Sequence, residues 1–283
     1  MPDEFEAHRR RCFAIAYRML GSTAEAEDVL QEAWIRWQGA AAQVESPGAY
    51  LAATVTRLCL DQLRSARVRR EQYVGPWLPE PIDTTGQEEV DPESISMAFL
   101  LLLERLSPPE RAALLLRQVF ELEYAEIAAI LGGTEAAARQ SFHRANEHLR
   151  AERPRYAASK EQHLRLLTGF VMAVERGEVG PIEALLAEDA RSWNDGGGRR
   201  RAALKTVVGR HNVAALFAGL VKKGNIPGRR PEIREINGWP ALLLWDGDEL
   251  ALTLSIETDG ELIFGVHVVL NPDKLQALKQ RPD

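Results

Sequence analysis

Residues 124–149 read YAEIAAILGGTEAAARQSFHRANEHL, in which a pair of glycines separates two apolar runs. Apolar side chains recur at helical spacing over residues 124–131 and again over residues 138–149. Gly132-Gly133 can take positive φ angles, and Thr134 can accept a backbone N–H bond where the next helix begins. The stretch therefore predicts two helices joined by a sharp turn.

The second of these helices carries polar residues opposite its apolar face, namely Arg139, Gln140, His143 and Arg144. Arg, Gln and His can hydrogen-bond base edges in a major groove, and Arg can also hold phosphates. The pair therefore fits a helix-turn-helix that reads duplex DNA. A helical hairpin with a solvated basic face is the alternative, because the sequence signal of this motif is loose.

Length and composition indicate an ordinary folded protein. At 283 residues, of which 45% are hydrophobic, the chain is long enough for two or three domains. No apolar run in the first thirty residues is long enough for export or a membrane span, so we expect a cytoplasmic protein with no membrane partner. Cys12 and Cys59 lie on apolar helix faces, which favours buried packing. No metal site is visible, and we expect no cofactor and no catalytic residue.

Charge is distributed unevenly along the chain. The formal net charge is -6, which argues against a protein that grips duplex DNA by charge alone. Residues 54–75 nevertheless carry five Arg against two acidic residues, and residues 134–155 carry five Arg against three Glu. Two basic stretches in an acidic protein predict weak autonomous DNA binding and a partner that supplies affinity.

The segments flanking the central stretch complete a domain plan. Residues 1–74 read as helices, with a capping box at Ser22–Glu25 and a third helix opened by Pro47. Residues 75–94 are a Pro- and Gly-containing linker, and residues 95–156 form a second helical domain. The third helix also carries a polar face, which is either solvated surface or a binding face; its members are Tyr50, Thr54, Arg57, Asp61 and Arg64.

Residues 157–283 change character and predict an α+β domain. Two amphipathic helices, 163–176 and 181–187, are followed by strand-like runs. Asn237-Gly238, Asp246-Gly247 and Asp259-Gly260 separate these runs and are strong hairpin signals. The fold class expected is therefore multidomain, with two all-α domains followed by an α+β domain that has a curved antiparallel sheet.

Several motifs resemble those of bacterial sigma factors. Residues 26–34, AEDVLQEAW, resemble the helix of region 2 that binds core RNA polymerase, and residues 56–64, TRLCLDQLR, resemble the helix that follows it. Residues 105–150 are similar to region 4. The combination resembles the extracytoplasmic-function (ECF) sigma factors, which keep only these two regions.

Three further motifs resemble signatures of an ECF subgroup with a fused, cone-shaped SnoaL-like (NTF2-like) domain. They lie in the linker, in the middle of the C-terminal domain and near its end: Trp77-Leu78-Pro79-Glu80-Pro81, Asp195-Gly196-Gly197-Gly198 and Asn271-Pro272-Asp273-Lys274-Leu275. The subgroup usually has Lys after the third Gly, where this chain has Arg199.

The resemblance implies binding to core RNA polymerase and to promoter DNA. It implies that Arg139, Gln140, His143 and Arg144 contact the -35 element as duplex, and that Arg57, Asp61 and Arg64 contact the non-template strand of the -10 element. Many relatives have Asn in place of Arg57. Asp28, Gln31 and Glu32 are the expected polymerase-binding residues, with a solvated acidic face as the alternative.

The resemblance also implies that the C-terminal domain contacts the linker and modulates activity. We expect it to hold the DNA-reading modules in a compact, weakly active arrangement. The alternatives are a regulator that binds operators without polymerase, a domain that senses a small-molecule ligand, and a cyclase or isomerase. In the last case Trp193, Asp195, Trp245 and His267 would line a cavity.

Overall fold

The computed structural model describes residues 2–87, 91–150, 158–223 and 229–279. Its contacts group the chain into two compact units. Residues 1–72 and 100–153 form the helical unit, and residues 73–99 and 154–283 form the sheet unit. The segment expected to be a linker therefore packs with the C-terminal residues.

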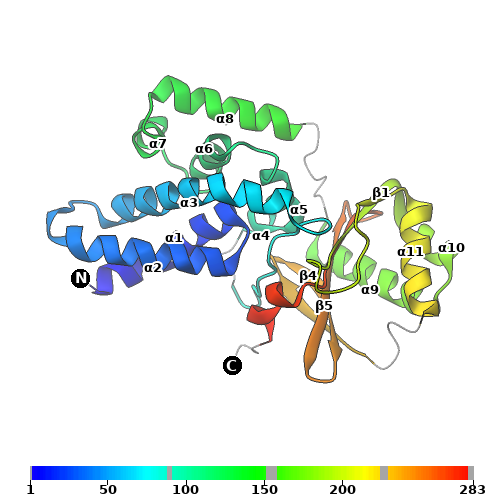
Figure 1. The fold of residues 1–283 in the computed structure, drawn as a ribbon. Coiled ribbons are helices and arrows are strands. Elements are labelled where there is room, and N and C mark those ends of the chain that lie inside the picture. The colour runs from blue at the N-terminus through cyan, green and yellow to red at the C-terminus, as the bar shows by residue number, and fades with distance from the viewer. Residues whose placement is uncertain (1, 88–90, 151–157, 224–228, 280–283) are drawn as a thin grey trace. The chain divides into compact units, whose positions relative to one another are not determined.

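The helical unit consists of helices (Figure 1), which are joined by short turns except where residues 73–99 intervene. These are α1 (Pro2–Leu20), α2 (Thr23–Ala40), η1 (Ala41–Gln43), α3 (Pro47–Glu71), the end of α5 (Met97–Leu103), α6 (Pro108–Gln118), α7 (Tyr124–Leu131) and α8 (Glu135–Arg150). The predicted turn is confirmed: Gly132 has φ 70° and ends α7, and Thr134 Oγ1 accepts from Ala137 N at 3.2 Å.

One core joins the early and late helices of this unit. Apolar residues of α6, α7 and α8 pack with Ala53 of α3. The buried Arg111 donates to Leu103 O at 2.9 Å and to Met19 O at 2.6 Å, and it pairs with Glu104 at 2.8 Å. Burial lowers the pKa of Arg111 to about 9. Cys12 and Cys59 are buried free thiols, as predicted.

The sheet unit contains a six-stranded sheet with strand order β2-β1-β6-β5-β4-β3. Its strands are β1 (Leu186–Asp195), β2 (Val207–Val208), β3 (Arg230–Ile236), β4 (Trp239–Asp246), β5 (Glu249–Thr258) and β6 (Ile263–Val269). Its helices are α4 (Pro92–Ile95), α9 (Lys160–Arg176), α10 (Val179–Glu183), α11 (Arg210–Lys222), η2 (Pro272–Lys274) and η3 (Gln276–Leu278). The expected fold class, helical segments followed by an α+β unit, is confirmed.

The two faces of the sheet differ. Helices α9, α10 and α11 lie on one face (Figure 1), where Phe170 and Phe217 pack on apolar residues such as Leu254, Ile256 and Val266. Side chains alternate along a strand, so residues such as Trp193 and His267 point to the opposite face. Their rings stack there, with centroids 4.9 Å apart.

Three expectations about this unit were wrong in detail. The sheet is mixed, because β1 pairs with β6 in parallel. The helix expected over residues 181–187 ends at Glu183, and Leu186 and Ala187 already belong to β1. Helix α11 was not expected; it follows Gly209 without a side-chain cap, so the usual start signal is missing. No helix of the described residues is both long and apolar enough to span a membrane.

Candidate functional site

The carboxylate of Asp195, at the end of β1, joins the 73–99 segment to the C-terminal residues. Asp195 is fully buried. Its Oδ1 accepts from Tyr73 Oη at 2.6 Å, and its Oδ2 accepts from Leu78 N at 2.9 Å and from Lys274 Nζ at 2.7 Å. Its backbone carbonyl accepts from Leu270 N and Asn271 N. One residue thus holds three stretches of chain together.

Lys274 completes this arrangement as a buried ammonium. Its Nζ lies 4.9 Å from the centroid of the Tyr73 ring and 4.3 Å from that of the Trp77 ring, and it donates to Leu78 O. Cation–π contacts are strongest where the cation is desolvated, and the side chain of Lys274 is only 8% exposed. The linker motif therefore contacts the Asn271–Leu275 motif at Lys274.

The glycines after Asp195 make room for this contact. A Cβ on Gly197 would lie 2.3 Å from Asn271 Nδ2 and 2.8 Å from Tyr73 Oη, and Gly197 has φ 56°. A Cβ on Gly196 would lie 2.3 Å from Arg200 O. The triplet is therefore not only a flexible turn, because side chains there would displace the groups that meet at Asp195.

The Tyr73 hydroxyl links the two side-chain partners of this site. It donates to Asp195 and accepts from Asn271 Nδ2 at 2.9 Å. Burial, together with the carboxylate of Asp195, raises the pKa of Tyr73 well above its ordinary value, so the phenol stays protonated. We refer to Tyr73, Leu78, Asp195, Asn271 and Lys274 as the Asp195 anchor.

The other members of the three motifs lie close in sequence to this anchor. Leu78 is fully buried, and Pro79 and Pro81 are also buried. Asp273 is exposed and pairs with Arg199 at 3.4 Å. Glu80, Gly198, Pro272 and Leu275 belong to the same stretches, and Leu275 is fully buried.

The acidic face predicted on α2 is exposed. Asp28, Gln31 and Glu32 point to solvent, and Glu32 pairs with Arg36 at 3.0 Å. Ile35 is 56% exposed, and its spacing places it on the same face. Sequence reasoning missed Ile35, although a large apolar side chain among these carboxylates is the kind of residue that contacts a protein partner.

Arg57 on α3 is engaged inside the helical unit. Its guanidinium donates to Ile130 O at 3.0 Å and to Ala129 O at 2.8 Å, at the C-terminal end of α7. A cation at this position interacts favourably with the helix dipole. Asp61 and Arg64 are exposed and pair with each other at 3.2 Å. Arg57, Asp61 and Arg64 are all exposed, but the Arg57 guanidinium is bonded to α7 in this arrangement.

The predicted reading face of α8 is exposed, but its two arginines are also tied to the protein. Arg139 pairs with Glu135 at 2.7 Å and lies 4.4 Å from the Tyr124 ring centroid. Arg144 pairs with the buried Glu110 at 3.0 Å. Gln140 and His143 are exposed on the same face. Arg67, Arg69, Arg150, Arg153 and Arg155 of the two basic stretches have side chains outside the described part of the structure.

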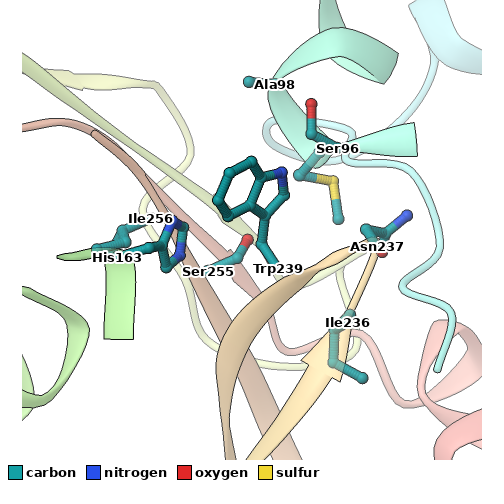
Figure 2. A pocket seen from close by; sticks show the side chains of 9 residues that line it. Ser96, Ala98, His163, Ile236, Asn237, Trp239, Ser255 and Ile256 are labelled. Carbon is teal, nitrogen blue, oxygen red and sulfur yellow. The ribbon is translucent and has the colours of Figure 1, made fainter. Parts of the chain in front are cut away.

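The four residues suggested for a catalytic cavity do not gather around one. Trp193 stacks on His267, Asp195 belongs to its anchor, and Trp245 Nε1 donates to Glu232 Oε2 at 2.7 Å. A cavity lined by other residues, among them Ser96, His163 and Trp239 (Figure 2), has a volume of about 10 Å³. That is room for about one water molecule, far below the roughly 300 Å³ of small-molecule sites.

Both helical segments match family models of sigma-70 factors. Sigma-70 region 2 matches residues 5–69, and Sigma-70 region 4 matches residues 96–149. The ECF RNA polymerase sigma factor SigJ of Mycobacterium tuberculosis is 37% identical over 228 residues, which cover 78% of this chain and 73% of SigJ.

Two further comparisons extend over nearly the whole chain. Another M. tuberculosis ECF RNA polymerase sigma factor, SigI, is 27% identical over 282 residues, covering 97% of this chain and 94% of SigI. A crystal structure of M. tuberculosis SigJ superposes with a TM-score of 0.77 at 29% identity, covering 98% of this chain and 99% of that one. The similarity therefore includes the sheet unit.

Proposed function

The chain belongs to the extracytoplasmic-function RNA polymerase sigma factors, and from that premise we propose that its own sheet unit regulates its promoter-directing activity through the Asp195 anchor. As an alternative sigma factor, it directs core RNA polymerase to specific promoters. The observation that supports regulation is the burial of the segment between regions 2 and 4 at Asp195, Lys274 and Tyr73. A docked segment limits how far the two regions can separate.

Separation of the two regions is what promoter recognition demands. The -35 and -10 elements lie far apart on the duplex, which rises about 3.4 Å per base pair. In the helical unit, however, α3 of region 2 packs against α6 and α7 of region 4. We propose that this arrangement is the weakly active form and that undocking of residues 73–81 favours the separated one.

The roles of individual surface residues follow from their exposure. We propose that Asp28, Gln31 and Glu32, with Ile35, contact core polymerase. Asp61 and Arg64 would meet the -10 non-template strand, and the exposed Arg57 would join them by exchanging its bonds to α7 for bonds to the strand.

On α8, we propose that Gln140 and His143 read base edges of the -35 duplex. Arg139 and Arg144 hold phosphates, and Arg144 also positions the helix through Glu110 on α6. Phosphate holding is one of the two roles that the sequence predicts for these arginines.

In vitro transcription with purified core polymerase and genomic DNA tests the regulatory proposal. Lys274→Met removes the ammonium but keeps an apolar side chain beside Tyr73 and Trp77. Breaking a buried ion pair costs on the order of 3 kcal/mol or more, so the docked state should lose most of its population. We expect severalfold higher transcript yield than from the unchanged chain.

Asp273→Asn is the matched control. Asp273 lies in the same motif as Lys274, but its side chain is exposed and pairs with Arg199 at the surface. The substitution should leave transcript yield unchanged. Limited proteolysis at residues 73–81 reports docking independently. If Lys274→Met opens this segment to protease while transcript yield stays at the original level, the regulatory role is wrong.

A further inference from the structure

We propose that the Asn237-Gly238 turn between β3 and β4 is a second, independent anchor, which binds residues 82–84 and 92–95 and stays closed when the Asp195 anchor opens. This inference rests on the proposed regulatory role of the sheet unit. Asn-Gly is favoured in two-residue hairpin turns for its backbone geometry alone, and Asn237 and Gly238 do have φ angles of 52° and 79°. The contacts of the two residues go beyond what a turn requires.

The Asn237 side chain joins two distant points of the segment. Its Oδ1 accepts from Ile82 N at 3.2 Å, and its Nδ2 donates to Ile95 O at 3.0 Å. Its own backbone N donates to Ile82 O at 2.9 Å. Asn237 is 2% exposed, so these bonds form away from water, where an unpaired amide would be costly.

The segment also adds to the edge of the sheet beside this turn. Asp83 forms an antiparallel bridge with Ile236, and Thr84 N donates to Glu235 O at 2.9 Å. The side chain of Asp83 pairs with Arg234 at 3.2 Å. Because β3 is the last strand of the sheet, this addition covers part of an otherwise unpaired edge.

Gly238 lets residues 84 and 92 approach the turn closely. Its N donates to Thr84 Oγ1 at 2.9 Å, and Thr84 is fully buried. A Cβ on Gly238 would lie 2.6 Å from Pro92 Cα, at the start of α4. The turn therefore contacts the segment at two places, residues 82–84 and residues 92–95.

The packing continues to the beginning of α5. Met97 and Ala98 line the small cavity together with His163, Trp239 and Ser255 (Figure 2). Five residues after Ile95 the chain enters the helical unit at Leu100. The second anchor therefore holds the end of the segment that leads into region 4, whereas the Asp195 anchor holds the end that leaves region 2.

The two anchors lie at different places on the sheet. Asp195 ends β1, and Asn237 joins β3 to β4, with β6 and β5 between them in the strand order. Their bonds involve different residues of the segment. Opening at Asp195 would therefore release residues 73–81 while region 4 stays tethered at Asn237, and full release requires both anchors to open.

Hydrogen exchange of the full-length chain, followed by mass spectrometry, tests the inference. Asn237→Gly removes the amide contacts but keeps a residue that favours the turn conformation. We expect about tenfold faster exchange in peptides from residues 82–87 and 91–97, since two buried hydrogen bonds are lost, with exchange at 73–78 unchanged. Asp248→Gly, in the hairpin turn between β4 and β5, is the matched control and should change neither.

Thr84 supplies a second pair of variants. Thr84→Ala should accelerate exchange at residues 82–87 as well, and Thr84→Ser, which keeps the hydroxyl, should restore slow exchange. The inference is overturned if Asn237→Gly leaves residues 82–87 and 91–97 as protected as before, or if it exposes residues 73–78 equally. In transcription, the transcript yield of the double variant Asn237→Gly, Lys274→Met should exceed that of Lys274→Met alone. Faster exchange without a higher yield would mean that the second anchor exists but that the proposed regulatory role is wrong.

Discussion

Tyr73 illustrates how much a single hydroxyl contributes to the Asp195 anchor. Tyr73→Phe would leave Asp195 Oδ1 and Asn271 Nδ2 buried without this partner. A buried polar group that loses its partner costs about 1–3 kcal/mol, so we expect the unfolding free energy of the sheet unit to fall by that amount. Urea denaturation followed by tryptophan fluorescence measures it. Tyr50→Phe, on α3 of the helical unit, should have no comparable effect on the sheet unit.

Three buried titratable residues make the stability of the sheet unit depend on pH. Burial lowers the pKa of His163 from 6.5 to about 4 and that of His267 from 6.5 to about 3. The contribution of the two neutral histidines to the free energy of unfolding is complete above pH 6.5, and it is lost as the pH falls through their folded pKa values. Burial raises the pKa of Glu257 from 4.5 to about 7, with Arg191 opposing the change. Its contribution is complete below pH 4.5 and is lost as the pH rises through 7.

These effects oppose each other between pH 4.5 and 6.5. Unfolding then takes up two protons at the histidines and releases one from Glu257, so stability should fall by about 1.4 kcal/mol per pH unit on acidification. Glu257→Gln removes the opposing group, and the slope should rise to about 2.7 kcal/mol per unit. Urea denaturation at several pH values measures both slopes. Equal slopes in the two proteins would contradict the assignment of Glu257.

At the scale of elements, α3 and α7 are joined by the Arg57 guanidinium. A guanidinium presents two donors in a fixed geometry, whereas Lys does not. Arg57→Lys should therefore weaken the bonds to Ala129 O and Ile130 O and loosen the end of α7. We expect severalfold faster amide exchange over Tyr124–Leu131. Arg64→Lys, on the exposed face of α3, should leave that exchange as it is.

The sequence predicts the local elements better than their pairing. Turn signals such as Asn237-Gly238 located the hairpins, because an Asn-Gly turn is specified by two residues. The parallel pairing of β1 with β6 depends on residues more than sixty positions apart, and no local signal encodes it. The motif at Asp195 was recognised, but its partner Tyr73 was not, since Tyr73 precedes the linker motif by four residues.

The side-chain contacts of Asn237 could not be predicted from the sequence for a different reason. The residue pair Asn237-Gly238 fits a hairpin turn so well that nothing in the sequence indicated a second task. Only the structure shows its side chain bound to Ile82 and Ile95. Arg57 is similar: its type and position fitted DNA contact, and its bonds to α7 depend on how the helices of the helical unit pack.

At the scale of the whole molecule, the chain passes between the two units three times, at Gln72, Phe99 and Arg153. Residues 73–99, between the first two crossings, group with residues 154–283, which follow the third. Removal of residues 158–283 would therefore delete most of the sheet unit and also strip residues 73–99 of the surface that holds Leu78 and Thr84, both fully buried.

We accordingly expect two results from a chain that ends at residue 157. Protease should cleave within residues 73–99 much faster than in the full-length chain, while α1–α3 and α6–α8 stay protected, because their shared core is retained. Transcript yield should reach or exceed that of Lys274→Met, since both anchors are absent. A truncated chain that is cleaved readily yet transcribes less than the full-length protein would mean that the sheet unit mainly supports polymerase engagement, and that docking of the segment does not restrain the two DNA-binding regions.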